Sequence, residues 1–133
     1  MSTFLLDANV LIALTVVEHQ HHDRSSGWIA RVSRFAVCPI VEGALFRFLL
    51  RLGESTHTAT AVLAGVRGHP KCEFWPDSLS YIDVDLTTVR GHRQVTDSYL
   101  VSLARARGGI LATLDSPLAD RYPDHSLLLP SGE

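Results

Sequence analysis

The chain has 133 residues and a net charge of −2, with 46% hydrophobic and 20% charged residues, which is the composition of an ordinary globular protein. This balance argues against a disordered chain and against a strongly basic nucleic-acid binder. The length predicts one domain, residues 1–133, with a sizeable core. No apolar run reaches the roughly 18 residues of a membrane span, and the N-terminus lacks the basic region of a secretory signal, so we expect a cytoplasmic protein. Cys38 and Cys72 are far apart and are expected to be buried or half-buried free thiols.

The first predicted element is a short buried strand over residues 3–7 that ends on Asp7. The apolar segment that follows, residues 10–17, predicts a helix. Residues 18–23 contain three histidines and two acids, but their spacing fits no zinc pattern, and we interpret them as a solvated helix end or loop. A helix over residues 26–32 and a second strand over 35–38 are predicted next.

The clearest predicted helix covers residues 40–52. Its inward stripe is built from apolar residues at spacings of three and four: Val41, Leu45, Phe48, Leu49 and Leu52. Glu42 lies in the first turn, at the margin of this stripe. By itself this acid could simply complement the helix dipole.

The second half of the chain repeats the alternation of helices and strands. We predict a helix capped by Ser55 or Thr56 and ending near residue 67, a long connection over 71–80, and a strand over 81–85. A helix over 98–107, a strand over 110–115, a short helix from residue 116 and a strand over 126–129 follow. The alternation predicts a three-layer α/β/α domain with a mainly parallel central sheet.

Four acids are expected at one edge of this sheet. Asp7 and Asp115 end predicted strands, whereas Glu42 and Asp97 begin predicted helices, and in a parallel α/β domain these positions share an edge. Each acid alone could be a helix cap, but four converging carboxylates repel one another unless a cation binds among them. Oxygen ligands without Cys or His favour Mg²⁺ or Mn²⁺, which can activate water against a phosphate. Thr113 points to the same side of its strand as Asp115.

Three segments carry a resemblance to a known family: FLLDANVLIAL, PIVEGALFRFL and QVTDSYLVSLARARGGILATLD. In order and spacing they resemble PIN-domain ribonucleases, specifically the VapC-type toxins of bacterial toxin–antitoxin pairs. The resemblance implies a Mg²⁺- or Mn²⁺-dependent endoribonuclease that hydrolyses RNA phosphodiester bonds. The acidic quartet of the family falls on Asp7, Glu42, Asp97 and Asp115, as metal ligands and catalytic residues, with Glu42 as a ligand or as the base that orients water.

The resemblance also assigns supporting residues. Asn9 and Thr113 fall on positions expected to support the acids or contact substrate. Arg90, His92 and Arg93 precede Asp97 and are candidates for contacts with RNA phosphates, although a solvated loop is an equal alternative.

The family implies two protein partners, a second copy of the chain and an antitoxin. Phe46, Phe48, Trp75 and the 55–67 helix are candidates for the apolar surface that the antitoxin covers, although core packing is an alternative for most of them.

Two other functions remain open. A phosphatase with Asp7 as nucleophile needs a second Asp two residues later, where this chain has Asn9, and a downstream lysine after a strand, whereas Lys71 follows a helix-ending proline. A non-catalytic module that binds a protein or RNA partner predicts dispersed acids, each capped separately.

Overall fold

The protein, described over residues 2–131 by a computed structural model, is built on a five-stranded sheet in the order β3-β2-β1-β4-β5. Every neighbouring pair of strands is parallel. The strands are β1 (Phe4–Leu6), β2 (Phe35–Val37), β3 (Cys72–Phe74), β4 (Ile110–Thr113) and β5 (Ser126–Leu128). The prediction of a mainly parallel sheet is therefore confirmed.

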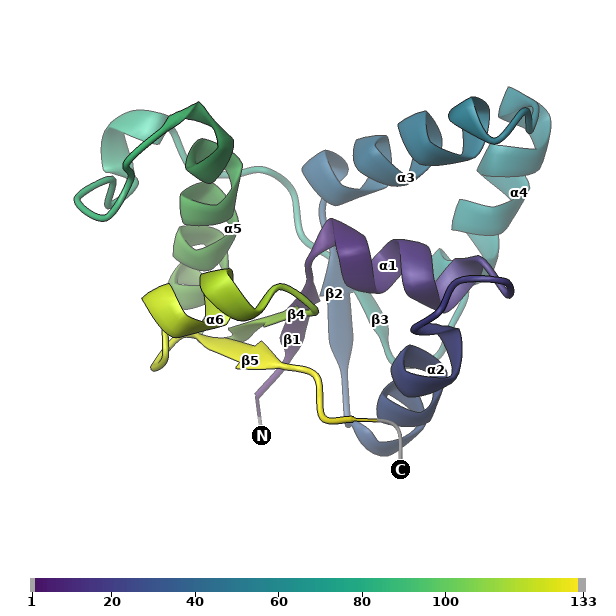
Figure 1. Cartoon of the computed structure of the whole chain (residues 1–133), viewed down its shortest axis with the longest axis horizontal. Coiled ribbons are helices and arrows are strands. Elements are labelled where there is room, and N and C mark those ends of the chain that lie inside the picture. The colour runs from purple at the N-terminus through teal and green to yellow at the C-terminus, as the bar shows by residue number, and fades with distance from the viewer. Residues whose placement is uncertain (1, 132–133) are drawn as a thin grey trace.

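Helices cover both faces of the sheet. They are α1 (Ala8–Thr15), α2 (His22–Arg31), α3 (Pro39–Arg51), α4 (Thr56–Arg67), α5 (Val95–Ala106) and α6 (Ser116–Arg121). Figure 1 shows α1 to α4 on one side of the strands and α5 with α6 on the other. This arrangement follows from right-handed crossovers that run outward from β1 in both directions, and it confirms the three-layer architecture.

The core is formed by the central strands and the helix faces that pack on them. Residues of β1, β2 and β4 are buried from both sides, which explains why these strands read as continuous apolar runs. Helix α3 contributes Val41, Leu45 and Leu49, as predicted. Leu52 is 58% exposed, however, so its place in the stripe was wrong: it lies after the last helical turn. Trp75, a candidate for a partner-binding surface, is 3% exposed and belongs to the core.

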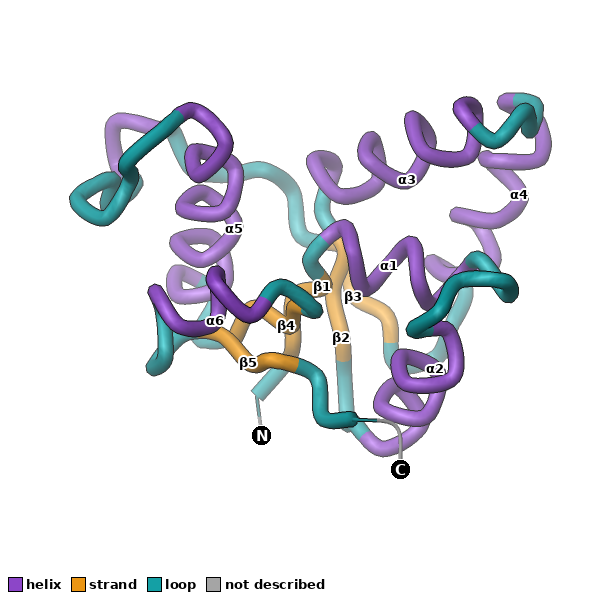
Figure 2. Tube along the Cα trace, in the orientation of Figure 1, coloured by secondary structure: helices purple, strands orange, loops and turns teal. Residues whose placement is uncertain are grey.

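The connection over residues 71–94 differs most from expectation. A third strand, β3, was missed, and the strand predicted over 81–85 is wrong. Tyr81–Asp83 form the 3-10 helix η1, where the Ser80 hydroxyl accepts a hydrogen bond from the Ile82 N–H at 3.2 Å. Ile82 is 93% exposed, although the alternation of apolar and polar residues over 81–85 predicted that it would be buried against the core. A second 3-10 helix, η2 (His92–Gln94), leads into α5, and Figure 2 shows this connection running from β3 over the end of α5.

Two glycines set the start of β4. Gly108 has a φ of +68°, which an L-residue rarely adopts, and it ends α5. At Gly109 a Cβ atom would collide with the Thr3 carbonyl oxygen and lie 2.9 Å from the ring of Trp75. The close approach fixes β4 beside β1, so that the residues after the two strands arrive at the same edge of the sheet.

Several smaller predictions are also settled. Helix α2 begins at His22, earlier than expected, and the His22 ring bonds the Ala13 carbonyl at 2.9 Å, so this histidine has a structural partner. Both cysteines are free, Cys38 buried and Cys72 half-buried, as expected. Within residues 2–131, each helix is too short or too polar to cross a membrane.

Candidate active site

Asp7 is the most constrained of the four predicted acids. It follows β1 and caps α1: its Oδ1 accepts a hydrogen bond from the Ala8 N–H at 2.8 Å, and its Oδ2 accepts one from the Thr113 hydroxyl at 2.7 Å. The residue is only 8% exposed. Burial raises the pKa of Asp7 to about 6; the two hydrogen bonds oppose this rise, and the charges of Asp97 and Asp115 add to it. The ionised form of Asp7 is thus costly in the molecule as it stands.

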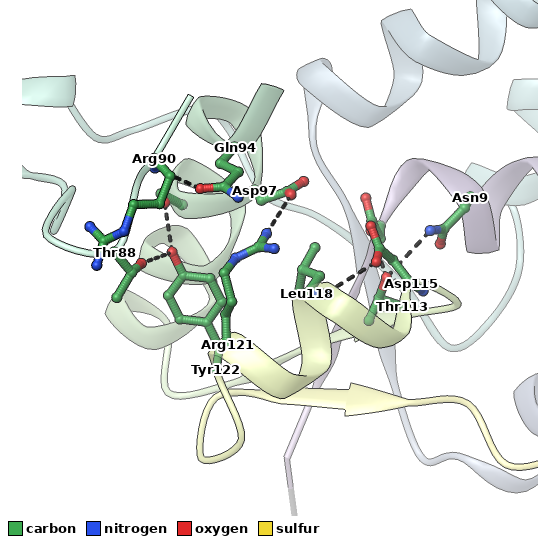
Figure 3. Close-up of polar contacts among 12 residues, drawn as sticks. Asn9, Thr88, Arg90, Gln94, Asp97, Thr113, Asp115, Leu118, Arg121 and Tyr122 are labelled. Atoms are coloured by element: carbon green, nitrogen blue, oxygen red, sulfur yellow. Dashed lines mark hydrogen bonds and ion pairs between the residues drawn. The ribbon is translucent and has the colours of Figure 1, made fainter. Parts of the chain in front are cut away.

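Thr113 joins the ends of β1 and β4. Its side chain is fully buried, and while its hydroxyl donates to Asp7, the same oxygen accepts from the Asn9 amide at 3.3 Å and from the Asp115 backbone N–H at 3.0 Å. The Asn9 side-chain oxygen in turn accepts from the Leu114 N–H at 3.1 Å. Figure 3 shows these side chains grouped beside Asp115. The two residues predicted to support the acids therefore fix the relative position of two of them.

Asp115 occupies the matching place after β4. It caps α6 through a hydrogen bond that its Oδ1 accepts from the Leu118 N–H at 3.1 Å. Asp115 is half-buried, and its backbone N–H donates a hydrogen bond to the Thr113 hydroxyl at 3.0 Å, which positions the residue after β4. A capping role and a role in the acidic cluster are compatible, because a carboxylate has lone pairs beyond those that a cap uses.

Asp97 lies in the first turn of α5, on the opposite face of the sheet from α1. Burial raises its pKa; the charge of Arg121 opposes this rise and the charge of Asp115 adds to it. Its Oδ2 accepts a hydrogen bond from Nη2 of Arg121 at 2.9 Å, within an ion pair. The charges of Asp97 and Asp115 add to the raised pKa of Asp7, and the charge of Asp115 adds to the raised pKa of Asp97, as expected for acids along a common edge of the sheet.

Glu42, in the first turn of α3, faces another arginine. Nη1 of Arg67, at the end of α4, lies 3.6 Å from its Oε2, and the Arg67 guanidinium stacks 4.4 Å from the centre of the Phe74 ring. The Oε2 atom is buried and finds no hydrogen-bond partner among the described residues. Asp7 and Asp115 thus follow β1 and β4, and Asp97 begins α5 at the same edge of the sheet, whereas Glu42 is turned toward α4.

The donor set has the right chemistry for a hard divalent cation, since it consists of carboxylates whose mutual repulsion an ion would relieve. The arrangement is incomplete, however. Among residues 2–131, the His, Cys, Asp and Glu side chains form no group of three or more that could hold a metal ion. The expected convergence of four carboxylates is thus partial, because the two acids on helices each face an arginine.

The predicted phosphate contacts, Arg90 and Arg93, are exposed around η2, as is His92. The Arg90 N–H donates to Oε1 of Gln94 at 2.7 Å, and its guanidinium donates to the Thr87 carbonyl at 3.5 Å. These contacts are local, and the hydrogen bonds and ion pairs of the described residues do not link either arginine to the acids.

Sequence reasoning missed two residues at the end of α6. Arg121 pairs with Asp97, and the Tyr122 hydroxyl lies 2.7 Å from both the Thr88 and the Ser98 hydroxyls (Figure 3). Tyr122 thus ties the loop before α5 to the residue next to Asp97. Neither residue carries a sequence signal, since the pairs span 24 to 34 positions and follow no periodicity.

Comparison with known proteins identifies the family to which the chain belongs. The PIN domain family model matches residues 4–122. Ribonuclease VapC29 of Mycobacterium tuberculosis is 52% identical over 130 residues, covering 97% of this chain and 98% of the relative. Ribonuclease VapC39 of the same species is 37% identical over 128 residues, covering 89% of this chain and 92% of the relative.

Two solved structures share the fold. The M. tuberculosis toxin VapC20, which is described as cleaving the sarcin–ricin loop, superposes with a TM-score of 0.68 at 14% identity, over 90% of this chain and 95% of that one. VapBC2 from Rickettsia felis, bound to promoter DNA, superposes with a TM-score of 0.64 at 16% identity, over 91% of this chain and 93% of that one. The chain belongs to the PIN domain family and, within it, to the VapC ribonucleases.

Proposed function

We propose that this protein is an endoribonuclease toxin that hydrolyses phosphodiester bonds in RNA with Mg²⁺ or Mn²⁺. The observation that carries the proposal is the placement of Asp7, Asp97 and Asp115 along one sheet edge, with Asp7 buried; burial, together with the charges of the other two acids, raises the pKa of Asp7 to about 6. A cation at that edge would offset the charge that the buried carboxylate bears at neutral pH. The named function of the VapC relatives supports the same reaction.

In this proposal Asp7, Asp97 and Asp115 would hold the cation, and Glu42 would be a further ligand or the base that orients water. When bound, the ion would act as a Lewis acid, lowering the pKa of water and stabilising negative charge on the departing oxygen. Thr113 keeps Oδ2 of Asp7 in place by donating to it at 2.7 Å. The buried Oε2 of Glu42 accepts no hydrogen bond among the described residues and has only the ion-pair contact with Arg67 at 3.6 Å, so it retains lone pairs that could accept a proton from water.

The basic loop before α5 is assigned to substrate. Arg90 and Arg93 are exposed close in sequence to Asp97, and exposed guanidinium groups suit contacts with a phosphate backbone. The Tyr122 hydroxyl, bonded to Thr88 and Ser98 at 2.7 Å, would hold this loop at a fixed distance from the acidic cluster.

The proposed partners are RNA, a cognate antitoxin and a second copy of the chain, acting in the cytoplasm. A groove between α1, α3 and α4 is lined in part by Val17, which is 69% exposed, and Leu52, which is 58% exposed. An exposed apolar groove of this kind suits an apolar segment of a partner protein. The VapBC2 structure from R. felis supports an antitoxin partner for this fold.

The phosphatase alternative gains no support from the site. Both oxygens of Asp7 accept hydrogen bonds, from Ala8 and Thr113, and the side chain is buried, which disfavours an attack on an external phosphate.

Incubation of purified protein with structured RNAs tests the proposal. We expect cleavage with Mg²⁺ or Mn²⁺ and none in EDTA. Expression of the chain alone should arrest bacterial growth, and Asp115→Ala should not. Cleavage that persists in EDTA would contradict the metal-dependent mechanism, and equal toxicity of Asp115→Ala would separate toxicity from this site.

A further inference from the structure

Arg121 places a positive charge directly on one of the clustered acids. It reaches from the last turn of α6 to the carboxylate of Asp97, with Nη2 and Oδ2 2.9 Å apart (Figure 3). The two side chains are 24% and 22% exposed, so solvent screens this pair only in part. The guanidinium lies 5.9 Å from the centre of the Tyr122 ring.

The position of Arg121 leaves one of its hydrogen-bond donors unsatisfied. Its Nε is buried and finds no acceptor within the described part of the chain. A buried N–H group without a partner is unfavourable, and it is rare in folded proteins. The ion pair with Asp97 therefore keeps the guanidinium where one of its donors is unsatisfied, and loss of that pair would release it.

A divalent cation and Arg121 compete for the same carboxylate. Asp97 has a raised pKa from burial and from the charge of Asp115, and the arginine partly offsets both effects. An ion bound by Asp97 would place two positive charges next to the guanidinium. Close like charges in a partly buried setting repel strongly.

We propose that Arg121 is a resident counter-ion of the active site: it neutralises Asp97 in the metal-free protein and must be displaced when the divalent cation binds. This inference rests on the proposed metal site. Among residues 2–131 no group of three or more His, Cys, Asp or Glu ligands is assembled, so binding of an ion requires that side chains move, and Arg121 is the residue that holds Asp97. The ion pair between Glu42 and Arg67 is longer than the one between Asp97 and Arg121, at 3.6 Å, and its arginine side chain is 43% exposed.

Titration of the metal-free full chain with Mn²⁺, followed by calorimetry, tests the proposal without reference to activity. Arg121→Met should bind Mn²⁺ more tightly, by on the order of tenfold, because the competing charge is gone. Arg121→Lys keeps the charge and should stay close to wild type. Arg51→Met removes the same charge from an exposed site at the end of α3, and should change Mn²⁺ affinity little.

The titration distinguishes failure of the counter-ion role of Arg121 from failure of the proposed metal site. Unchanged or weaker Mn²⁺ binding by Arg121→Met, with a melting temperature near that of wild type, would overturn the counter-ion role and leave the metal site intact. An equal gain for Arg121→Lys would also overturn it, since the effect would then not come from charge. Absence of Mn²⁺ binding to wild type and variants alike would overturn the proposed metal site together with this inference.

Discussion

The four predicted acids form two halves that are held in different ways. Asp7 and Asp115, which follow β1 and β4, are fixed by hydrogen bonds from backbone N–H groups and from Thr113. Asp97 and Glu42, which begin α5 and α3, are instead paired with arginines from elsewhere in the chain. The strand-end half, Asp7 and Asp115, is held in position without a ligand. The helix-start half, Asp97 and Glu42, has its negative charge balanced by arginines.

The difference follows from the elements that carry each acid. A residue directly after a buried parallel strand inherits the rigidity of the sheet, and the next helix supplies N–H donors that orient its carboxylate. A residue in the first turn of a helix lacks this support from the sheet, and both acids of this kind are paired with a long, flexible arginine. We therefore expect the strand-end half to be sensitive to small changes and the helix-start half to tolerate them.

The largest effect is expected from breaking the strand-end half at its centre. Asp7→Asn removes the charge of the most buried acid, and RNA cleavage with Mn²⁺ should fall by about a thousandfold or more. The kcat of cleavage of a fixed RNA substrate measures this effect, with circular dichroism as the check on folding. A variant that retained more than about a tenth of wild-type activity would contradict the role of Asp7.

The next largest effect is expected at Thr113. Thr113→Val keeps the shape but removes the hydroxyl that bonds Asp7, Asn9 and the Asp115 N–H, which leaves buried polar groups without partners. The free energy of unfolding should fall by about 1–3 kcal/mol, as measured by urea denaturation. Thr113→Ser, which keeps the hydroxyl, is the matched control and should lose clearly less; an equal loss in both would mean that the methyl group matters more than the hydrogen bonds.

A pH effect should also come from the strand-end half. The native pKa of Asp7, about 6, lies above its ordinary value of 3.8, so the stability it contributes is fully present below pH 3.8 and is lost as pH rises through 6. Asp7→Asn lacks this titration. Between about pH 5 and about pH 7.5, the difference in unfolding free energy between wild type and Asp7→Asn, without metal, should shift by about 1–2 kcal/mol in favour of the variant. A constant difference would mean that Asp7 is ionised throughout.

The smallest effect is expected in the helix-start half. Arg67→Met breaks the Glu42 pair, which is long and has a partly exposed arginine. The free energy of unfolding should change by less than about 0.5 kcal/mol, with thermal unfolding as the measurement. A loss as large as that of Thr113→Val would erase the contrast between the two halves.

The features that could be predicted from the sequence depend on residues close to one another along the chain. The apolar runs before Asp7 and Asp115 predicted buried parallel strands. The two-residue spacing of Thr113 and Asp115 predicted a shared side of one strand, but β4 ends at Thr113 and Asp115 caps α6; the contact between the two residues is a hydrogen bond from the Asp115 N–H to the Thr113 hydroxyl. The apolar stripe of α3 predicted the helix that carries Glu42.

What sequence could not predict depends on contacts between distant residues. Arg121 and Arg67 meet their acids 24 and 25 positions away, and no periodicity marks such pairs. Strand β3 lies at a sheet edge and has the charged Glu73 at its centre, so it lacks the apolar run that marks β1 and β2. The alternation over 81–85 misled because a Ser80 cap favours a 3-10 turn there.

The most direct test of the proposed site is a crystal structure of the full chain grown with Mn²⁺, with the ion located by its anomalous scattering. We expect an anomalous peak contacted by Asp7, Asp97 and Asp115, directly or through water, with the Arg121 guanidinium moved off Asp97. A peak elsewhere, or no peak at Mn²⁺ concentrations that support RNA cleavage, would contradict the proposed metal site.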